Sequence, residues 1–516
     1  MLLNYLLAAL PVLILLGLMV GLRWGAQRAG PASWLAGVLI AIVAFGLTPA
    51  VWWVSQVRGL LLALFVLAVM WPALLLYNLV DRTGGIRALA HGLQHVIHDR
   101  GLLLLVLAWA FSGLLEGLAG FGLPIAIVSP MLVVLGVDPV IAVAAVAVGH
   151  AWSVTFGDMG VIFQTLSAVV QMDPAVLAPA AAAMLGVACL ACGLVTARIL
   201  GQMRLWPAVL ALGTLMALVQ YGMAVGGLTP LAAFGAGLAG VLGAVLYSRG
   251  KPAPADQNSP VLAGSAALPA VGGQFFSPAL LGALASYGSL AVVMTAIAWP
   301  GPLRAALLPT VWQVSFPEVI TRTGFLTLAG PGTAFRPFTH PGSAILLAAL
   351  LSFALFRRFK LCAPADLSGA ARATWHSAAP ASIGIIATVG LSTLMEHTGM
   401  TQLLASGMAN LMGAAFPLVS PLVGILGAFA TGSNNNSNVL FAPLQKSAAA
   451  LLSIDPRLLL AAQTAGGALG SMLAPAKITV GCSTVGLKGR EGDVLRRTLL
   501  PGLLIGLLLG VIALLF

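Results

Sequence analysis

Charged side chains are scarce in this chain. Asp, Glu, Lys and Arg make up 7% of its 516 residues, whereas a soluble domain carries about 25%. Hydrophobic residues make up 60%, and the mean hydropathy is +1.05. This composition excludes a soluble globular protein and predicts an all-α, polytopic membrane protein.

Long polar segments are missing as well. Apolar stretches of about 20 residues, each long enough to cross a bilayer as a helix, recur throughout the chain. Examples are residues 3–22, 59–80, 208–225, 228–247, 278–299, 343–356 and 498–516. Counting broken or re-entrant segments, we predict roughly 11 to 14 transmembrane helices. The longest polar insert, residues 248–274, is rich in Pro, Ala and Gly and is predicted to be a cytoplasmic loop.

Acidic residues are few relative to basic ones, and the formal net charge is +11. The basic residues form clusters between the apolar stretches, as at residues 23–28, 82–100 and 488–497. This placement is a topology signal and does not predict nucleic-acid binding. By the positive-inside rule the clustered loops face the cytoplasm. The chain is therefore predicted to cross a bacterial inner membrane many times, with its N- and C-termini in the periplasm.

Common catalytic and nucleotide-binding motifs are also lacking. There is no Walker loop, GxSxG or HExxH sequence, so neither ATP-driven transport nor hydrolysis has support. Four cysteines give no disulfide framework, and neither a metal site nor a cofactor is predicted. A membrane-embedded transferase is a remote alternative. The outer segment 301–342 offers Glu318 and His340 for it, but in no recognisable catalytic arrangement.

Two regions of the chain resemble each other. Residues 116–160 and 430–475 each begin with a glycine-containing tip, continue into a short apolar stretch and reach an Asp-Pro pair, at Asp138 and at Asp455. Asp caps a helix and Pro tolerates its first position, so each pair predicts a helix start. A second break follows in each region, at residues 156–160 and 472–477. Hydrophobic segments interrupted at matching places predict two inverted structural repeats with a binding site between them.

The two tips supply the candidates for substrate binding. The first tip, residues 119–124, has glycines that let the backbone approach a ligand closely. The second, residues 431–438, reads TGSNNNSN between apolar stretches, where uncharged donors and acceptors are costly unless they bind something or line water. Free N–H groups of a helix that follows the tip would favour a carboxylate. The predicted substrate-binding residues are Gly120, Phe121, Gly122, Thr431, Gly432, Ser433, Asn434, Asn435, Asn436, Ser437 and Lys477.

Ionisable residues near the breaks are candidates for proton coupling. Glu116 and Asp158 lie in apolar surroundings beside the first tip, where burial favours the protonated form of a carboxylate. The alternative for both is a structural pairing with a cation or a loop backbone. His150 follows a small-residue stretch, where a proton relay and polar packing are both open. Lys477 either offers its charge to a carboxylate or extends toward the membrane surface.

These residues give the chain a resemblance to the lactate permease family of bacterial lactate and glycolate transporters. The matching segments are EGLAGFGLPIAI (residues 116–127), TGSNNNSNVLFAPLQ (431–445) and AAQTAGGALGSMLAPAKITVGCSTVGLKGREGDVLR (461–496). The resemblance implies a proton-coupled symporter of L-lactate, D-lactate, glycolate or a related 2-hydroxy monocarboxylate. It also implies an ion-transporter-superfamily architecture with a scaffold and a moving transport domain.

The chain departs from this family pattern in three places. Family members commonly read TGSDT or TGSNT where residues 431–435 read TGSNN, and Ser-Pro-Gln where residues 474–477 read APAK. They usually have an apolar or small residue near Asp158. The additional lysine and acid would suit a larger or more charged carboxylate.

The sequence thus predicts a secondary transporter, not an enzyme, that works by alternating access and couples a small carboxylate anion to a proton. A sodium-coupled carboxylate or dicarboxylate carrier is the alternative, because amide and carbonyl oxygens also suit Na⁺. Glycines at 502, 506 and 510 predict close helix packing, within the chain or across a homodimer in the lipid bilayer. The predicted divisions are scaffold helices (1–100), a first repeat (101–200), intervening helices (201–400), a second repeat (401–497) and a C-terminal helix (498–516).

Overall fold

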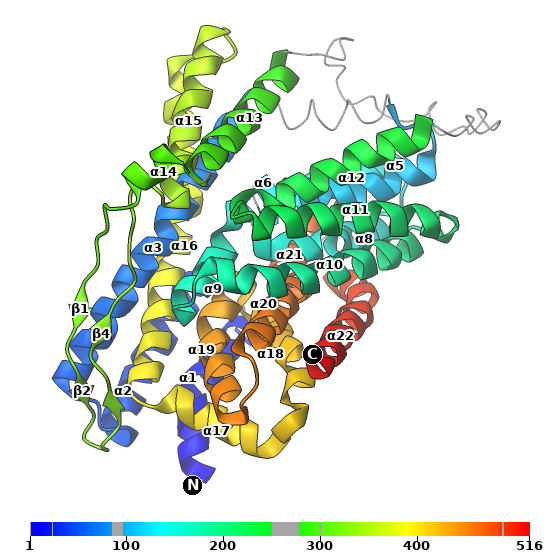
Figure 1. The fold of residues 1–516 in the computed structure, drawn as a ribbon. Helices are drawn as coiled ribbons and strands as arrows, with labels where there is room; N and C mark the ends of the chain where they lie inside the picture. Colours follow the sequence, from blue (N-terminus) through cyan, green and yellow to red (C-terminus); the bar gives the residue numbers. More distant parts are fainter. Residues whose placement is uncertain are drawn as a thin grey trace.

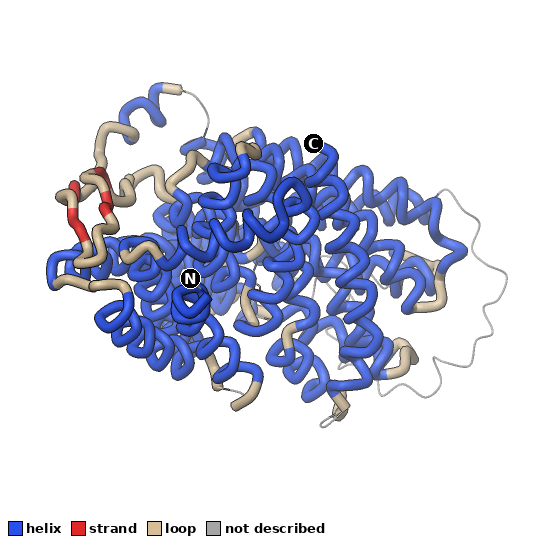
Figure 2. Tube along the Cα trace, turned by 90° about the horizontal axis from the view of Figure 1, so that it is seen from below, coloured by secondary structure: helices blue, strands red, loops and turns tan. Residues whose placement is uncertain are grey.

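Helices account for most of the structure, which is a computed structural model (Figures 1 and 2). It describes residues 2–22, 24–84, 96–118, 120, 122–249, 278–298, 301–487 and 490–516. Within these ranges, 12 helices are long and apolar enough to cross a membrane. That number lies inside the predicted range of spans and confirms a polytopic helical membrane protein.

The N-terminal helices pack with one long helix from later in the chain. The group comprises α1 (Leu2–Val20), α2 (Ala26–Ala44), α3 (Pro49–Arg82) and α16 (Pro364–His397). α16 packs along both α2 and α3, and α1 packs on α2 (Figure 1). Thr48 sets the start of α3, because its hydroxyl accepts a hydrogen bond from the N–H of Val51 at 3.3 Å.

The first predicted repeat is a series of interrupted helices. Its segments are α5 (Arg100–Val106), the π-helical η1 (Leu107–Phe111), α6 (Ser112–Leu118), α7 (Leu123–Val134), α8 (Pro139–His150), the 3-10 turns η2 (Ala151–Phe156) and η3 (Asp158–Gly160), α9 (Val161–Val170) and α10 (Pro174–Ile199). Asp138 caps α8 by accepting hydrogen bonds from the N–H groups of Val140 and Ile141 at 2.9 and 3.1 Å. The helix start predicted from the Asp-Pro pair is therefore confirmed.

The second predicted repeat follows the same plan. Its segments are α17 (Met400–Met412), the 3-10 turn η7 (Gly413–Ala415), α18 (Phe416–Thr431), α19 (Asn434–Leu452), α20 (Pro456–Leu473) and α21 (Pro475–Thr484). Asp455 caps α20 by accepting a hydrogen bond from the N–H of Arg457 at 2.8 Å, as predicted. The second break falls at Ala474, between α20 and α21. Both regions thus read helix, glycine tip, helix, Asp-capped helix and break, and α20 packs against η2 and α10 of the first.

The second tip is shorter than the sequence predicted. The polar tract 431–438 was predicted as irregular backbone before a helix, but α19 already begins at Asn434. Only Gly432 and Ser433 separate α18 from α19. Asparagine is a moderate helix former, and here it fills the first turn, where N–H groups need no partner within the helix.

Besides α16, the described residues between the repeats form five helices and a small β-structure. The helices are α11 (Trp206–Val225), α12 (Ala232–Arg249), α13 (Pro278–Ala298), α14 (Pro302–Leu307) and α15 (Pro341–Arg358), with 3-10 turns η4 (Met203–Leu205) and η5 (Thr229–Leu231). α13 and α15 pack side by side at one end of the molecule (Figure 1). Apart from its first two residues, the loop predicted at 248–274 lies outside the described residues.

The segment 301–342, predicted to lie on the outer side, adds strands to an otherwise helical fold. β1 (Ser315–Phe316) pairs antiparallel with β4 (Gly330–Pro331), and β2 (Val319–Ile320) pairs antiparallel with β3 (Leu326–Thr327). These strands lie at one edge of the molecule (Figure 2). Arg58 of α3 holds them there, since its guanidinium donates to the carbonyls of Gly330 and Pro331 at 3.1 and 3.3 Å.

The last helix, α22 (Glu491–Leu515), packs within the chain through its row of glycines. Gly502 faces the side chains of Met472 and Leu473, and Gly510 faces the backbone of Leu418. Of the two alternatives for this glycine row, the structure therefore provides the partner inside the chain, on α18 and α20.

Candidate functional site

Each tip contains a glycine in the left-handed backbone region. Gly122 has φ 84° and directly precedes α7, while Gly432 has φ 74° and directly follows α18. Residues with a side chain rarely adopt this conformation, so the chain needs glycine at both turns. Gly120 is also described, whereas Phe121, a predicted binding residue, lies outside the described residues.

Both tips face the start of α21. A Cβ atom built on Gly122 would lie 3.7 Å from Cγ of Lys477, and one built on Gly432 would lie 3.7 Å from Cβ of Ala476. Ala476 and Lys477 belong to the first turn of α21. The structure therefore brings both tips to the second break of the second repeat.

Three helix N-termini meet here without side-chain caps. The N-cap residues are Gly122 for α7, Ser433 for α19 and Ala474 for α21, and no side-chain hydrogen bond caps any of them. Uncapped N–H groups and the positive ends of helix dipoles attract anions. Ser433 and Ala476 keep accessible surface, so this region is open at its edge.

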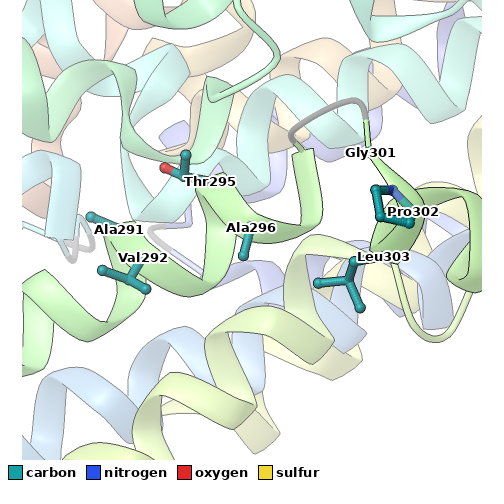
Figure 3. A pocket seen from close by; sticks show the side chains of 7 residues that line it. All are labelled: Ala291, Val292, Thr295, Ala296, Gly301, Pro302 and Leu303. Atoms are coloured by element: carbon teal, nitrogen blue, oxygen red, sulfur yellow. The ribbon is translucent and has the colours of Figure 1, made fainter.

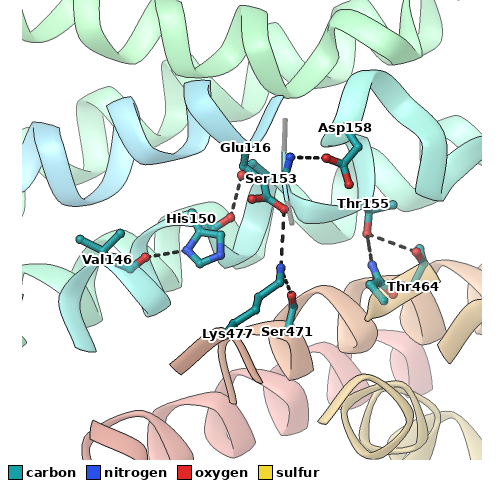
Figure 4. Close-up of polar contacts among 11 residues, drawn as sticks. Glu116, Val146, His150, Ser153, Thr155, Asp158, Thr464, Ser471 and Lys477 are labelled. Carbon is teal, nitrogen blue, oxygen red and sulfur yellow. Dashed lines mark hydrogen bonds and ion pairs between the residues drawn. The ribbon is translucent and has the colours of Figure 1, made fainter. Parts of the chain in front are cut away.

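A cluster of two acids and one lysine lies beside the first tip (Figure 4). Nζ of Lys477 lies 3.8 Å from Oε1 of Glu116 and donates a hydrogen bond to Oγ of Ser471. Oδ1 of Asp158 accepts a hydrogen bond from the N–H of Gly120. The side chains of Glu116 and Lys477 are 1% and 12% exposed, so this charge pair is almost fully buried.

The two carboxylates converge on Gly120. A Cβ atom built there would lie 2.7 Å from Oε1 of Glu116 and 2.7 Å from Oδ1 of Asp158. The backbone that carries Asp158 is unusual, because Asp158 and Met159 both have positive φ, at 50° and 54°. Non-glycine residues held in this region carry strain, which is typical of functional sites.

His150 lies at the end of α8 and is fully buried. Its Nδ1 is 2.7 Å from the carbonyl oxygen of Val146, and a carbonyl only accepts, so Nδ1 carries the proton. Nε2 is then free to accept, and it has no hydrogen-bond partner among the described residues. The ring lies within electrostatic range of both Glu116 and Lys477 (Figure 4).

The asparagines of the second tip join the two repeats. Nδ2 of Asn434 donates to Oγ1 of Thr155 at 3.1 Å and to the carbonyl oxygen of Thr464 at 3.2 Å. Nδ2 of Asn438 donates to Oγ1 of Thr464 at 2.9 Å. Asn435 is buried beside them, and its Oδ1 has no partner among the described residues. Thr155 belongs to the first repeat, so these bonds fix the second tip against η2.

Other predicted residues have structural hydrogen bonds. The hydroxyl of Thr431 donates to the carbonyl oxygen of Gly427 at 2.7 Å and closes the end of α18. The hydroxyl of Ser437 donates to the carbonyl oxygen of Gly424 at 2.9 Å, facing α18 and not the tip. Asn436 is buried in the first turn of α19.

Three hydroxyl residues at the site were not predicted. Thr155 and Thr464 hydrogen-bond to Asn434, and Ser471 accepts from Lys477. Thr155 lies next to the second break of the first repeat, and Ser471 just before that of the second. For Thr155 and Ser471, proximity to a break was thus the available signal, whereas Thr464 lies in the middle of α20.

A pocket elsewhere in the structure lacks this chemistry. It lies between α13 and α14 (Figure 3), and Thr295 contributes the polar side chain among otherwise apolar lining residues. Neither tip borders it. No group of three or more His, Cys, Asp or Glu side chains suited to a metal ion occurs in the part of the chain that the structure describes.

The chain has membrane-length helices that are broken at matching places, and buried charges lie between the breaks. These features are those of a membrane transporter. Comparison with known families identifies the family of transporters to which the chain belongs. The chain belongs to the L-lactate permease family, whose model matches residues 4–250 and 310–516. The resemblance predicted from the tip motifs is therefore confirmed.

Relatives named as permeases match along nearly the whole chain. The glycolate permease GlcA of Escherichia coli K12 is 27% identical over 541 residues, which cover 99% of this chain and 95% of the relative. The L-lactate permease of Bacillus subtilis 168 is 28% identical over 554 residues, with the same coverage of 99% and 95%. These relatives are named as permeases, which are transporters.

A solved transporter shares the fold. The YdaH transporter of Alcanivorax borkumensis matches with a TM-score of 0.50 and 16% sequence identity. The match covers 89% of this chain and 87% of that one. At this identity the similarity concerns the fold alone.

Proposed function

We propose that this protein is a proton-coupled symporter of a small 2-hydroxy monocarboxylate, of the lactate or glycolate type, in the bacterial inner membrane. The observation that carries the proposal is the buried cluster of Glu116, Asp158 and Lys477 beside two glycine tips. The names of the relatives, L-lactate permease and glycolate permease, give the substrate class. No cofactor takes part, and the coupling ion is the proton.

The three uncapped helix N-termini bind the anion. Backbone N–H groups at the starts of α7, α19 and α21 point toward the region between the tips, and Lys477 adds a full positive charge. A carboxylate there meets hydrogen-bond donors and positive potential together. The side-chain oxygen of Asn435 is buried and has no hydrogen-bond partner among the described residues, so it supplies an acceptor for a substrate hydroxyl.

The acids of the cluster bind the coupling proton. Two carboxylates that converge on Gly120 repel each other when both are ionised, and burial adds to the cost of charge. Binding a proton to one of them relieves both effects. Alternating access then carries the proton and the anion together, because both sit between elements of the two repeats.

One observation favours sodium coupling as a second candidate. The side-chain oxygens of Asn434, Asn435 and Asn438 are buried and accept no hydrogen bond from the described residues. Amide oxygens are good ligands for hard cations such as Na⁺. A carrier that uses them would transport a carboxylate with sodium.

Uptake of radiolabelled L-lactate and glycolate into proteoliposomes tests the proposal, with a pH gradient and a Na⁺ gradient imposed separately. We expect the pH gradient to drive uptake. An Asn435→Ala variant should lose it, whereas Asn410→Ala, which alters an exposed residue of α17, should not. Uptake that requires Na⁺ would favour the second candidate. Absence of uptake of both acids under both gradients would contradict the lactate-type assignment.

A further inference from the structure

The cluster contains one ammonium group and two carboxylates, and they are not equivalent. Lys477 pairs with Glu116 at 3.8 Å, while the carboxylate of Asp158 accepts the N–H of Gly120. Glu116 uses one oxygen, Oε1, for this pair. Its other oxygen, Oε2, is buried without a hydrogen-bond partner among the described residues. Glu116 can therefore bind a proton on Oε2 while Oε1 faces the ammonium group of Lys477.

We propose that Lys477 is the receptor for the substrate carboxylate, and that a proton on Glu116 releases Lys477 for this task. This exchange of ion-pair partners rests on the proposed function and specifies how the anion and the proton are coupled. In the empty carrier the ammonium pairs with the Glu116 carboxylate. In the loaded carrier it pairs with the substrate carboxylate, and Glu116 is the neutral acid. The proton that enters on Oε2 leaves from the same atom when the substrate departs.

Coupling between proton and substrate follows from the energetic cost of the two states in which only one of them is bound. A proton on Glu116 without substrate removes the carboxylate that pairs with Lys477 and leaves the buried ammonium without its ion-pair partner, which is unfavourable. Substrate without a proton places two carboxylates against one ammonium and leaves an excess negative charge. The empty and the fully loaded carriers have the same net charge at this site. They are therefore the two states in which the ammonium of Lys477 has one carboxylate as its ion-pair partner.

The location of Lys477 suits a receptor. Its side chain passes Gly122 of the first tip, and the preceding Ala476 faces Gly432 of the second. Substrate bound between the tips thus lies next to the ammonium group and to the uncapped start of α21. Ser471 accepts a hydrogen bond from Nζ and keeps the ammonium in place during the exchange.

Two other titratable groups face this pair. Asp158, from η3, is held by the backbone N–H of Gly120, and we assign it to positioning the first tip. His150, from α8, has a free Nε2 within electrostatic range of Glu116 and Lys477. A neutral histidine with a free acceptor nitrogen can pass a proton to or from Glu116. Among the described residues, neither Asp158 nor His150 forms an ion pair with the ammonium of Lys477; Glu116 does.

Three variants test the exchange: Glu116→Gln, Lys477→Gln and the double variant. For the wild type we expect the apparent KM for lactate to rise with pH, by up to about tenfold per pH unit, because one proton binds together with each substrate molecule. Glu116→Gln imitates the protonated acid, so it should keep lactate exchange, lose accumulation driven by a pH gradient, and show a KM that no longer depends on pH. Lys477→Gln should raise KM about tenfold or more, since its receptor charge is gone. Retained pH-driven accumulation in Glu116→Gln would overturn the proposal.

A binding experiment with acetate separates this inference from the proposed function. Glu116→Gln leaves the ammonium unpaired, so acetate at neutral pH should raise the melting temperature of this variant by several degrees. It should not do so for the double variant, which lacks the ammonium. If acetate fails to stabilise Glu116→Gln, the exchange is wrong even when lactate transport is found. If acetate stabilises it but the wild type transports neither lactate nor glycolate, the exchange stands and the substrate assignment fails.

Discussion

At the residue scale, the site depends on one position that has no room for a side chain. Gly120 lies against the carboxylates of Glu116 and Asp158 and donates its N–H to the latter. Its role differs from that of Gly122, whose positive φ sets the turn. Space for two acids, and not backbone freedom alone, thus restricts position 120 to glycine.

Substitution of Gly120 by alanine should therefore abolish most uptake. The new methyl group would lie 2.7 Å from an oxygen of each carboxylate. Overpacking of a filled site costs about 1–3 kcal/mol. At the transport site this cost corresponds to a loss of about 5- to 150-fold in the rate of uptake. Gly222→Ala is the matched control, because no atom lies within 4 Å of a Cβ built at that helical glycine. Equal uptake by both variants, at equal protein levels, would refute the crowding argument.

Sequence reasoning found the charged members of the site but not their pairing. Glu116 and Lys477 stand out because ionisable side chains are rare in apolar stretches. Their contact depends on how the two repeats pack, and local sequence patterns carry no information about it. The sequence does not predict Thr155 and Thr464 as members of the site, for a different reason. A hydroxyl in an apolar helix usually bonds to its own backbone, so its type gives no hint of a partner in another repeat.

At the element scale, the two Asp-Pro pairs and the glycine tips fix where helices begin and end. These local features were predictable, since capping depends on neighbouring residues. The exact length of the second tip was not predictable. Asparagine is common both in turns and in first helical turns, so the tract could not reveal that α19 starts at Asn434.

The cap of α5 makes a pH-dependent contribution to stability. Burial alone would raise the pKa of Asp99, but hydrogen bonds from Arg204 and from the N–H of Leu102 outweigh it and lower the pKa below its ordinary value of 3.8. A lowered pKa means that the stabilisation is complete above that ordinary value and disappears as the pH falls through the lower, folded-state pKa.

Two substitutions at Asp99 separate the ion pair from the cap. Asp99→Asn keeps an acceptor for the N–H of Leu102 and should lose only the pair with Arg204, about 0.2–1 kcal/mol at neutral pH. Asp99→Ala should lose about 1 kcal/mol more, the usual value of an N-cap. Thermal unfolding in detergent measures both. The difference between wild type and Asp99→Asn should decrease as the pH falls below 3.8 and vanish below the lowered pKa of Asp99 in the folded protein. A difference that stays constant over this range would argue against an ionic origin.

The glycine row of α22 is a second feature of this scale. Alanine at Gly510 would push against the backbone of Leu418, whose Cα would lie 3.0 Å from the new methyl group. We expect a loss of about 1–3 kcal/mol in stability, despite the better helix propensity of alanine. Gly492→Ala on the same helix meets no atom within 4 Å and should be neutral or slightly stabilising. Comparison of the two melting temperatures in detergent decides the point.

At the scale of the whole molecule, a native cysteine reports the orientation in the membrane. Cys362 lies between α15 and α16, and it is the accessible one of the four cysteines, because Cys189, Cys192 and Cys482 are buried. The basic residues around it, Arg357, Arg358 and Lys360, predict a cytoplasmic location.

A membrane-impermeant maleimide should therefore label inside-out vesicles but not intact cells. Burial, with the charge of Asp366, raises the pKa of the Cys362 thiol, so labelling should accelerate as the pH rises toward that pKa and more thiolate forms. Cys362→Ser should remove the signal. Labelling of intact cells would reverse the predicted orientation.

The position of Lys477 late in the chain has a consequence for biogenesis. During synthesis the helices that carry Glu116 and Asp158 enter the membrane long before α21 has left the ribosome. Until then the two acids have no lysine nearby, and a buried carboxylate without a counter-charge is unfavourable. We therefore expect the nascent first repeat to pack less stably than the same repeat in the complete protein. Chains truncated before residue 477 should be preferred substrates of membrane proteases.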